Sequence, residues 1–307
     1  MTIVLLVILI IVLLLLALGY AAFFFGVVRI NTHADPKFAK SLAKYRTEIL
    51  SGGNWFRAQG PQRIELNAYD GLRLVGYFLP AASAKGTLLL VHGYRSSPFT
   101  DFGVIYRFFH SLGWNILAVW QRSHGESEGK YITFGVKERY DVRTWTQYLL
   151  DRFGADHPVV LDGVSMGAAS VLMSLGTGLP ENVRGVIADC GFTSPYDEFA
   201  HVLKTRLHIP LHPIADIAQV FSRLFAGFDF RACSTVDALR QNTLPVLLVH
   251  GERDTFVPCR FSQENYEACA GDKKLILVPE AGHGASYLIE RERCQAELIA
   301  FLARFAD

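Results

Sequence analysis

The stretch Pro158-Val-Val-Leu-Asp-Gly-Val-Ser-Met-Gly-Ala-Ala-Ser-Val-Leu-Met173 decides the fold class of this 307-residue chain. It begins with a short apolar run, Pro158–Leu161, that is typical of a buried strand. It ends in Ala168–Met173, a run of small and helix-forming residues. Between the two runs, Gly163 and Gly167 flank a serine and allow a sharp turn of the backbone. The stretch therefore predicts a strand that leads directly into a helix.

Short apolar runs of the same kind recur along the chain and alternate with segments of helical length. A hairpin comes first, because two alternating segments, Arg63–Asn67 and Leu72–Leu79, flank the turn signal Asp70-Gly71. Strands and helices in alternation imply an α/β fold, with a mostly parallel sheet covered by helices on both faces. Further strands are expected at Thr87–Val91, Trp114–Trp120, Pro158–Leu161, Arg184–Ala188, Pro245–Val249 and Lys274–Val278, and helices at Asp101–Leu112, Val136–Phe153, Ala168–Leu175, Arg260–Ala270 and Tyr287–Phe305.

One interval, about residues 192–240, breaks this alternation because it contains no clear strand. Ser194-Pro-Tyr-Asp197 has the composition of a helix start, with serine as the N-cap, proline at the first position and an acid at the third. Pro210 and Pro213 then interrupt the chain, and a second helical pattern follows at Ile214–Leu224. We expect this interval to form a small helical cap over the edge of the sheet.

Apolar residues make up 50% of the chain, and they are concentrated at its N-terminus. The run Ile3–Val28 contains no charged residue and is longer than the about 20 apolar residues that a membrane-spanning helix needs. A cleaved signal peptide is one alternative, but it has a basic start and a shorter apolar region. A buried globular helix is the other, but such a helix is seldom apolar all round over this length.

These observations give a division of the chain. We predict a single uncleaved transmembrane anchor at residues 1–30, a juxtamembrane segment at 31–62 and a globular domain at 63–307. Within the juxtamembrane segment we expect a helix at Pro36–Ile49 and a linker at Ser51-Gly52-Gly53.

The charges next to the apolar run indicate an orientation. Positive charges lie just after the run, whereas only the terminal amine precedes it, and the positive-inside rule then places the globular domain in the cytoplasm. Five cysteines, an odd number without CxxC or metal-like spacing, fit free thiols in a reducing compartment. The positive residues are Arg29, Lys37, Lys40, Lys44 and Arg46.

Several kinds of partner are disfavoured by the sequence. The net charge is +1, which does not suggest the basic surface of a nucleic-acid-binding protein, and there is no phosphate-binding loop or dinucleotide fingerprint. His201, His208 and His212 lie close together, but Pro210 interrupts their helical spacing and no acid or cysteine completes a ligand set. We therefore expect no metal and no cofactor, and the sequence does not indicate an oligomeric state.

The pattern Gly-x-Ser-x-Gly occurs twice, at Gly163–Gly167 around Ser165 and at Gly125–Gly129 around Ser127. A nucleophile elbow requires a buried strand directly before the serine and a helix directly after it. Only Ser165 has both, because Ser127 lies in a polar loop with no helix start behind it. We predict that Ser165 is a catalytic nucleophile and that Ser127 is a structural residue of its loop.

A serine nucleophile needs a base within hydrogen-bond reach and an acid that orients the base. After an elbow of this kind the chain order is serine, acid, histidine. His283 is the only histidine beyond the candidate acids, and it lies in a glycine-flanked loop after the last expected strand, where a surface turn residue is the alternative. Asp254 is the favoured acid, because a short carboxylate in a turn is well held. Glu252 in the same loop and Asp189 at the end of a strand are its rivals.

The tetrahedral intermediate of such a reaction needs hydrogen-bond donors for its oxyanion. One is expected from the residue after the nucleophile, the N–H of Met166, and the other from the loop after an early strand, the N–H of Tyr94. His92, in the same loop, precedes Ser165 in the chain and is expected to hold the loop rather than act as the base.

Four motifs in this order resemble the α/β-hydrolase superfamily, and in particular the branch of serine-aminopeptidase-like and monoacylglycerol-lipase-like enzymes with membrane-anchored members. The resemblance covers roughly Arg63 to Phe305. The motifs are Val91-His-Gly-Tyr94, Gly163-Val-Ser-Met-Gly167, His250-Gly-Glu-Arg-Asp254 and Gly282-His-Gly284.

The loop Gln121–Gly129 also resembles a loop of this branch that supports the active site, with two departures. Gln121 stands where the branch usually has aspartate, and Ser123 stands where glycine is common. Because the loop does no chemistry itself, neither departure affects the predicted triad.

The resemblance implies hydrolysis of an ester, thioester or amide of a small acyl substrate through an acyl-enzyme, without metal or organic cofactor. We favour a carboxylic ester, lipid-like because the anchor keeps the domain near a bilayer. A serine peptidase or amidase with the same triad is the alternative, and a non-catalytic, membrane-tethered binding protein is a more remote one. The apolar residues of the cap either bind an acyl chain or pack on the sheet; they are Phe192, Tyr196, Phe199, Leu203, Leu207, Leu211, Phe221, Leu224, Phe225, Phe228 and Phe230.

Overall fold

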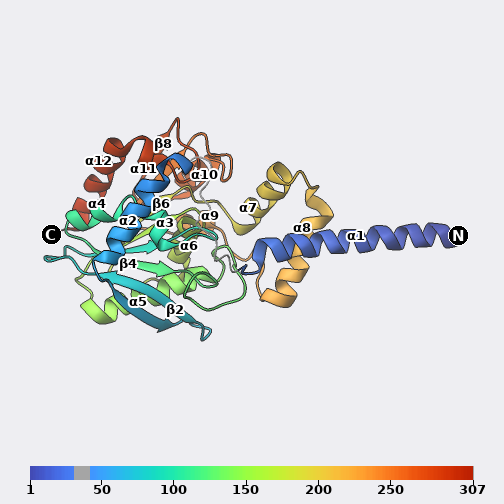
Figure 1. The fold of residues 1–307 in the computed structure, drawn as a ribbon, viewed down its shortest axis with the longest axis horizontal. Coiled ribbons are helices and arrows are strands. Elements are labelled where there is room, and N and C mark those ends of the chain that lie inside the picture. Colours follow the sequence, from blue (N-terminus) through green and yellow to red (C-terminus); the bar gives the residue numbers. More distant parts are fainter. Residues whose placement is uncertain (31–41, 307) are drawn as a thin grey trace.

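An eight-stranded sheet forms the centre of the molecule, and helices cover both of its faces (Figure 1). The structure is a computed structural model that describes residues 1–30 and 42–306. The strands are β1 (Gln62–Asn67), β2 (Arg73–Leu79), β3 (Thr87–Val91), β4 (Asn115–Trp120), β5 (Val159–Val164), β6 (Val183–Asp189), β7 (Val246–Gly251) and β8 (Lys273–Val278). Their order in the sheet is β1-β2-β4-β3-β5-β6-β7-β8. The hairpin β1–β2 is antiparallel, β2 is antiparallel to β4, and the other neighbours are parallel, which confirms the predicted fold class.

The central strands β3 to β7 are buried on both sides of the sheet, as their continuous apolar runs predicted. Along β3, Leu89 and Val91 belong to the apolar cluster under α5, α6 and α9, whereas Leu88 and Leu90 belong to the cluster under α2, α3, α4 and α12. The α-helices are α1 (Thr2–Val27), α2 (Arg46–Ala58), α3 (Pro98–Asp101), α4 (Tyr106–Ser111), α5 (Glu138–Phe153), α6 (Met166–Ser174), α7 (Pro195–His201), α8 (Leu211–Phe221), α9 (Thr235–Arg240), α10 (Arg260–Ala268), α11 (Ser286–Ile289) and α12 (Arg291–Leu302). The shorter helical segments are η1 (Ala43–Tyr45), η2 (Leu175–Thr177), η3 (Val202–Arg206), η4 (Ser222–Ala226) and η5 (Ala303–Phe305).

Two predictions on the segments that form α2, α3 and α4 are wrong, and both have the same physical reason. The linker expected at Ser51-Gly52-Gly53 lies inside α2, and the single helix expected at Asp101–Leu112 is divided into α3 and α4. A Cβ on Gly52 would lie 1.7 Å from the carbonyl oxygen of Gly103, so glycine is needed where these segments touch. The glycines thus serve close packing rather than a flexible connection. Most of the helix expected at Pro36–Ile49 lies outside the described residues, and its described part is occupied by η1 and the start of α2.

The interval predicted as a cap consists mainly of helices. Ser194 is the N-cap of α7, accepting a hydrogen bond from the Asp197 N–H, and α8 follows after the proline-rich interruption. Phe192, Phe199 and Phe230 are buried in a third apolar cluster. That cluster also contains Phe23 and Val27 of α1, so the cap packs against the N-terminal helix (Figure 1).

Helix α1 has 26 residues and is long and apolar enough to cross a membrane. Its C-terminal end is joined to the globular part by hydrogen bonds, while its N-terminal end projects away from it (Figure 1). The carbonyl oxygens of the last turn of a helix have no partner within the helix. Here Gly26 O accepts from the Tyr94 hydroxyl at 2.7 Å, Phe25 O accepts from the Arg95 guanidinium at 2.7 Å, and Val27 O accepts from the Ile132 N–H at 2.8 Å. The end of α1 is therefore fixed to the loop that follows β3.

Candidate active site

Ser165 lies at the turn between β5 and α6, in a backbone conformation that is unfavourable for a residue with a side chain. Its φ is 56° and its ψ is −116°. The turn is tight on both sides, because a Cβ on Gly163 would lie 2.4 Å from Gly167 O and one on Gly167 would lie 1.9 Å from Val91 O. The Ser165 N–H donates to Asp189 O at 2.8 Å. The structure thus has the strand–turn–helix geometry that the sequence predicted around this serine.

His283 and Asp254 come together from two loops at the carboxyl ends of neighbouring strands. Asp254 follows β7 and His283 follows β8. His283 Nδ1 lies 2.6 Å from Asp254 Oδ2. The other carboxylate oxygen, Oδ1, accepts from the N–H groups of Phe256 at 2.8 Å and Val257 at 3.0 Å. Both oxygens of Asp254 therefore have partners, and the imidazole of His283 is oriented by one of them.

The environment of Asp254 keeps its carboxylate ionised. Burial opposes ionisation, but hydrogen bonds from His250 and His283 outweigh it and hold the pKa of Asp254 well below its usual range. His250 is fully buried, with Nε2 3.4 Å from Asp254 Oδ2 and Nδ1 2.6 Å from the Ser262 hydroxyl. Sequence reasoning assigned no role to His250, although its place at the start of the His250–Asp254 motif was visible.

The two rival acids lie in other environments. Glu252 is exposed. Asp189 is half-buried, and the burial of its carboxyl raises its pKa to about 6. Its Oδ1 has no hydrogen-bond partner within the described part of the chain. Among the three candidate acids, Asp254 is the one for which the structure gives a hydrogen bond to His283.

Ser165, His283 and Tyr94 line one pocket. The loop after β3 approaches the serine closely, because a Cβ on Gly93 would lie 3.3 Å from the Cβ of Ser165. The Gly93 N–H donates to Asp101 Oδ2 at 2.7 Å, so it is already engaged, and Tyr94 provides the next N–H along the loop. Met166, the other predicted donor, is the first residue of α6, where helix N–H groups have no partner within the helix. Asp101 was not identified from the sequence, because its contact with Gly93 depends on the fold of the loop.

His92 and Gln121 hold this loop in place. His92 is fully buried, its Nδ1 lies 2.8 Å from Gly93 O, and its Nε2 accepts from the Gln121 N–H at 3.1 Å. The side-chain amide of Gln121 donates to His92 O. His124 adds a further bond, because its Nε2 accepts from the Arg95 N–H at 2.9 Å, and burial lowers the pKa of His124 to about 4. His92 thus makes the loop contacts expected of a structural residue.

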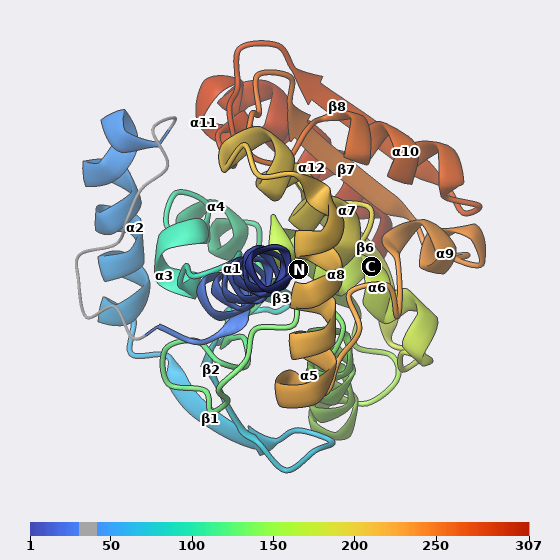
Figure 2. The ribbon, with the colours of Figure 1, turned by 90° about the vertical axis from the view of Figure 1, so that its right-hand side faces the viewer.

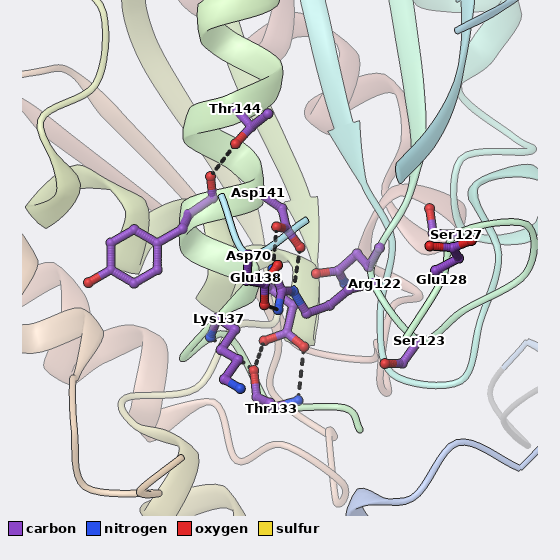
Figure 3. Close-up of polar contacts among 12 residues, drawn as sticks. Asp70, Arg122, Ser123, Ser127, Glu128, Thr133, Lys137, Glu138, Asp141 and Thr144 are labelled. Carbon is purple, nitrogen blue, oxygen red and sulfur yellow. Dashed lines mark hydrogen bonds and ion pairs between the residues drawn. The ribbon is translucent and has the colours of Figure 1, made fainter. Parts of the chain in front are cut away.

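The supporting loop 121–129 is fixed by a buried arginine (Figure 3). Arg122 forms two hydrogen bonds of 2.6 Å with the carboxylate of Asp141 in α5 and two, of 2.8 and 3.3 Å, with Asp70 in the β1–β2 turn. Burial opposes the charge, but the hydrogen bonds to Asp141 and Asp70 raise the pKa of Arg122 above its usual value. Ser123 has a φ of 62°, a conformation that glycine adopts more easily and that fits the resemblance drawn from the sequence, in which glycine is common at this position.

Two sequence predictions on side chains near the site can be compared with their surroundings. Ser127 is buried in its loop, accepting from the Val75 N–H at 2.9 Å and donating to Trp120 O at 2.8 Å. This is the arrangement of a loop-stabilising serine. The eleven apolar residues of the cap are absent from the described lining of the pocket that contains Ser165, so the structure gives no support to their binding an acyl chain there.

Cys190 is a further polar side chain beside the histidine–carboxylate pair. It follows β6, is fully buried and has a φ of 48°. One ligand-type atom of each of Cys190, Asp254 and His283 lies within 4.8 Å of the others, so these are the donor groups at the site that could approach a metal ion. Burial raises the pKa of the Cys190 thiol, which disfavours the thiolate that a metal requires. His283 Nδ1 is also engaged with Asp254, so the group is better suited to orienting an imidazole than to binding a metal.

The fold and the arrangement of this pocket define a hydrolase of the α/β class. The chain belongs to the alpha/beta hydrolase family, whose sequence profile matches residues 88–298. It is 27% identical over 237 residues to YqkD of Bacillus subtilis, covering 77% of each chain, and 24% identical over 267 residues to YfhR of Escherichia coli K12, covering 85% of this chain and 86% of that protein. An esterase of Pyrococcus furiosus superposes with a TM-score of 0.67 at 25% identity, covering 82% of this chain and 94% of the esterase.

The backbone conformation of Ser165 leads to a prediction on stability. Replacing Ser165 by glycine relieves the unfavourable φ and ψ, whereas replacing it by alanine removes the hydroxyl and retains the strain. We expect Ser165→Gly to be more stable than Ser165→Ala by about 1 kcal/mol. The measurement is chemical denaturation of both variants in the same detergent. Equal midpoints for the two variants, or a lower midpoint for glycine, would contradict a strained turn.

Proposed function

We propose that this protein is a membrane-anchored serine hydrolase that cleaves a carboxylic ester through an acyl-enzyme on Ser165. The observation that carries the proposal is the 2.6 Å bond between His283 Nδ1 and Asp254 Oδ2 in the pocket that Ser165 also lines. A hydrogen bond at Nδ1 leaves Nε2 of the imidazole as the nitrogen that can take the serine proton. The family of the chain and the esterase among its structural relatives support hydrolysis.

In the proposed reaction, His283 takes the proton of the Ser165 hydroxyl as the oxygen attacks the acyl carbonyl. Asp254 holds the imidazole and stabilises its cation, a role that fits an ionised carboxylate with all its oxygens hydrogen-bonded. The N–H groups of Tyr94 and Met166 stabilise the oxyanion. The protonated His283 then gives its proton to the leaving alcohol, and water activated by the same imidazole releases the acid.

An ester is preferred over a peptide because the named hydrolytic relative is an esterase. Part of the pocket wall is apolar, with Ile30, Ile105 and Phe256 among its residues, which fits an acyl group. A peptidase or amidase would use the same three residues but would additionally require His283 to protonate an amine leaving group.

The membrane part of the proposal rests on α1, whose N-terminal half is exposed and, after Thr2, apolar throughout. We infer that α1 is an uncleaved anchor, because Phe23 and Val27 are buried against the cap and the last turn is hydrogen-bonded to the globular part. The positive residues that follow α1, beginning with Arg29, favour a cytoplasmic domain.

The orientation leads to a topology prediction. A reporter that is active only in the cytoplasm is expected to be active when fused after Asp307 of the full chain. A second reporter that is active only outside the cytoplasm is expected to be silent at the same position. The reverse pattern would place the globular domain on the other side of the membrane.

The nucleophile is tested with a fluorophosphonate probe, which labels activated serines covalently. We expect the full chain to be labelled and Ser165→Ala to be unlabelled, with ester hydrolysis lowered by about 10⁵–10⁶-fold. Ser127→Ala is the matched control, since Ser127 lies in the other Gly-x-Ser-x-Gly pattern, and this variant should keep its label. Equal labelling of Ser165→Ala and the unchanged protein would exclude Ser165 as the nucleophile, and no labelling at all would favour a non-catalytic binding protein.

The substrate class is tested by comparing kcat/KM for p-nitrophenyl esters of graded acyl length with that for aminoacyl anilides. We expect the esters to be hydrolysed and the anilides to react more slowly by several orders of magnitude, because part of the pocket wall is apolar and fits an acyl chain. Faster hydrolysis of the anilides would establish the peptidase alternative.

A further inference from the structure

The cap exposes large apolar side chains that the active site does not use. Leu224 is 71% exposed, Leu207 and Phe225 are each 54% exposed, and Val220 is 51% exposed. None of these four lines the pocket that contains Ser165. Exposed leucine or phenylalanine is ordinary when scattered singly, but Val220, Leu224 and Phe225 lie within two turns of one another on α8 and η4. Such a group indicates a binding surface. The question is what covers these side chains.

The position of the cap beside α1 indicates what covers these exposed side chains. Helix α8 runs across α1 and η4 continues from it, so that α1 viewed end-on lies against the side of α8 (Figures 1 and 2). The crossing is close, because a Cβ on Gly19 would lie 2.3 Å from Ile217. Tyr20 packs edge to face on Phe221, with ring centroids 5.2 Å apart. The cap thus contacts α1 from about Gly19 onward.

The length of the exposed part of α1 then determines how deep the cap would lie in a bilayer. Residues Thr2–Leu14 are all exposed, and they extend over about 20 Å at about 1.5 Å per residue. The hydrocarbon core of a bilayer is about 30 Å thick. If α1 spans it, about 10 Å of the span must come from the following two turns, which reach Gly19 and Tyr20. The segment of α1 that touches α8 therefore lies within the near side of the bilayer, and α8 lies there with it.

The chemistry of the cap fits this depth. On α8, Ile214, Ala215 and Ala218 are buried toward the protein, while Val220, and Leu224 one turn further on in η4, face outward. The charged groups next to them are paired, which lowers the cost of placing them near lipid. Asp216 pairs with His212 at 2.6 Å and lies 3.8 Å from Arg231, and Arg223 pairs with Asp229. Lys204 and Arg206 in η3 are exposed and can reach lipid phosphates.

We propose that η3, α8 and η4 form a second membrane contact, in which Leu207, Val220, Leu224 and Phe225 insert into the lipid leaflet around α1. The partner is a phospholipid bilayer, and the cap lies on it in the manner of an interfacial amphipathic element rather than spanning it. This inference rests on the proposed anchoring by α1. The same inference places the active site near the bilayer. The pocket of Ser165 is also lined by residues that follow α1, Arg29 and Ile30, and by Arg206 of the cap. The pocket therefore opens at the bilayer surface.

Depth-dependent fluorescence quenching tests the contact on the full chain in phospholipid vesicles. Single tryptophans are introduced as Leu224→Trp in the cap, Leu9→Trp in α1 and Ile299→Trp in α12. Ile299 is the matched control, because it is an exposed aliphatic residue at 46% exposure on α12, a helix remote from the cap (Figure 1). The vesicles contain lipids brominated either near the carbonyl end or near the middle of the acyl chains. The signal of the unchanged protein, with its four native tryptophans, is subtracted.

We expect the Leu224→Trp variant to be quenched by lipids brominated near the carbonyl end, at a depth of about 5–10 Å below the headgroups, while the Ile299→Trp variant is not quenched. The Leu9→Trp variant is expected to be quenched most by lipids brominated near the middle of the chain. Quenching of Leu9→Trp without quenching of Leu224→Trp would overturn the cap contact and leave the anchor in place. Absence of quenching in Leu9→Trp would remove the anchor and with it this inference, while labelling of Ser165 would report independently on the hydrolase.

Discussion

The turn at Ser165 is the constraint on which the rest of the site depends. A side chain in this position, at φ 56° and ψ −116°, is tolerated only because the neighbouring backbone is packed around it. Gly163 and Gly167 allow β5 and α6 to approach each other and the end of β3 without a Cβ between them. The same packing brings the loop of Tyr94 to the serine. The sharp turn at Ser165 and the approach of the loop of Tyr94 are therefore consequences of one close backbone contact.

The predictions that succeeded depend on local pattern. The strands from β3 to β8 were expected near their observed positions because they appear in the sequence as continuous apolar runs. The strands β1 and β2 were expected from their alternating pattern around Asp70-Gly71. The N-cap residue of α7, Ser194, was predicted from an equally local pattern. What failed or was missed depends on contacts between segments far apart in the chain. Gly52 looks like part of a linker until Gly103 is seen against it, and the roles of Asp101 and His250 become visible only when their loops are folded.

The two departures from the related enzymes have different physical explanations. Ser123 adopts a left-handed backbone conformation, so the loop keeps its shape at some cost in strain, and the hydroxyl donates to Tyr131 O at 2.7 Å. Gln121 replaces a usual acid and uses its amide to hold the carbonyl of His92, while its oxygen accepts from the Ser170 hydroxyl at 3.3 Å. An ionised carboxylate cannot donate to that carbonyl. The glutamine is thus suited to this loop.

The hydrogen bonds from Tyr94 and Arg95 to the last turn of α1 have a geometric consequence for where the enzyme works. They restrict how far the end of α1 can move relative to the loop beside Ser165. If α1 lies in a membrane, as proposed, these bonds hold Ser165 close to the lipid surface, at a height set by the fold. The enzyme would then search for its substrate by diffusion in the plane of the membrane.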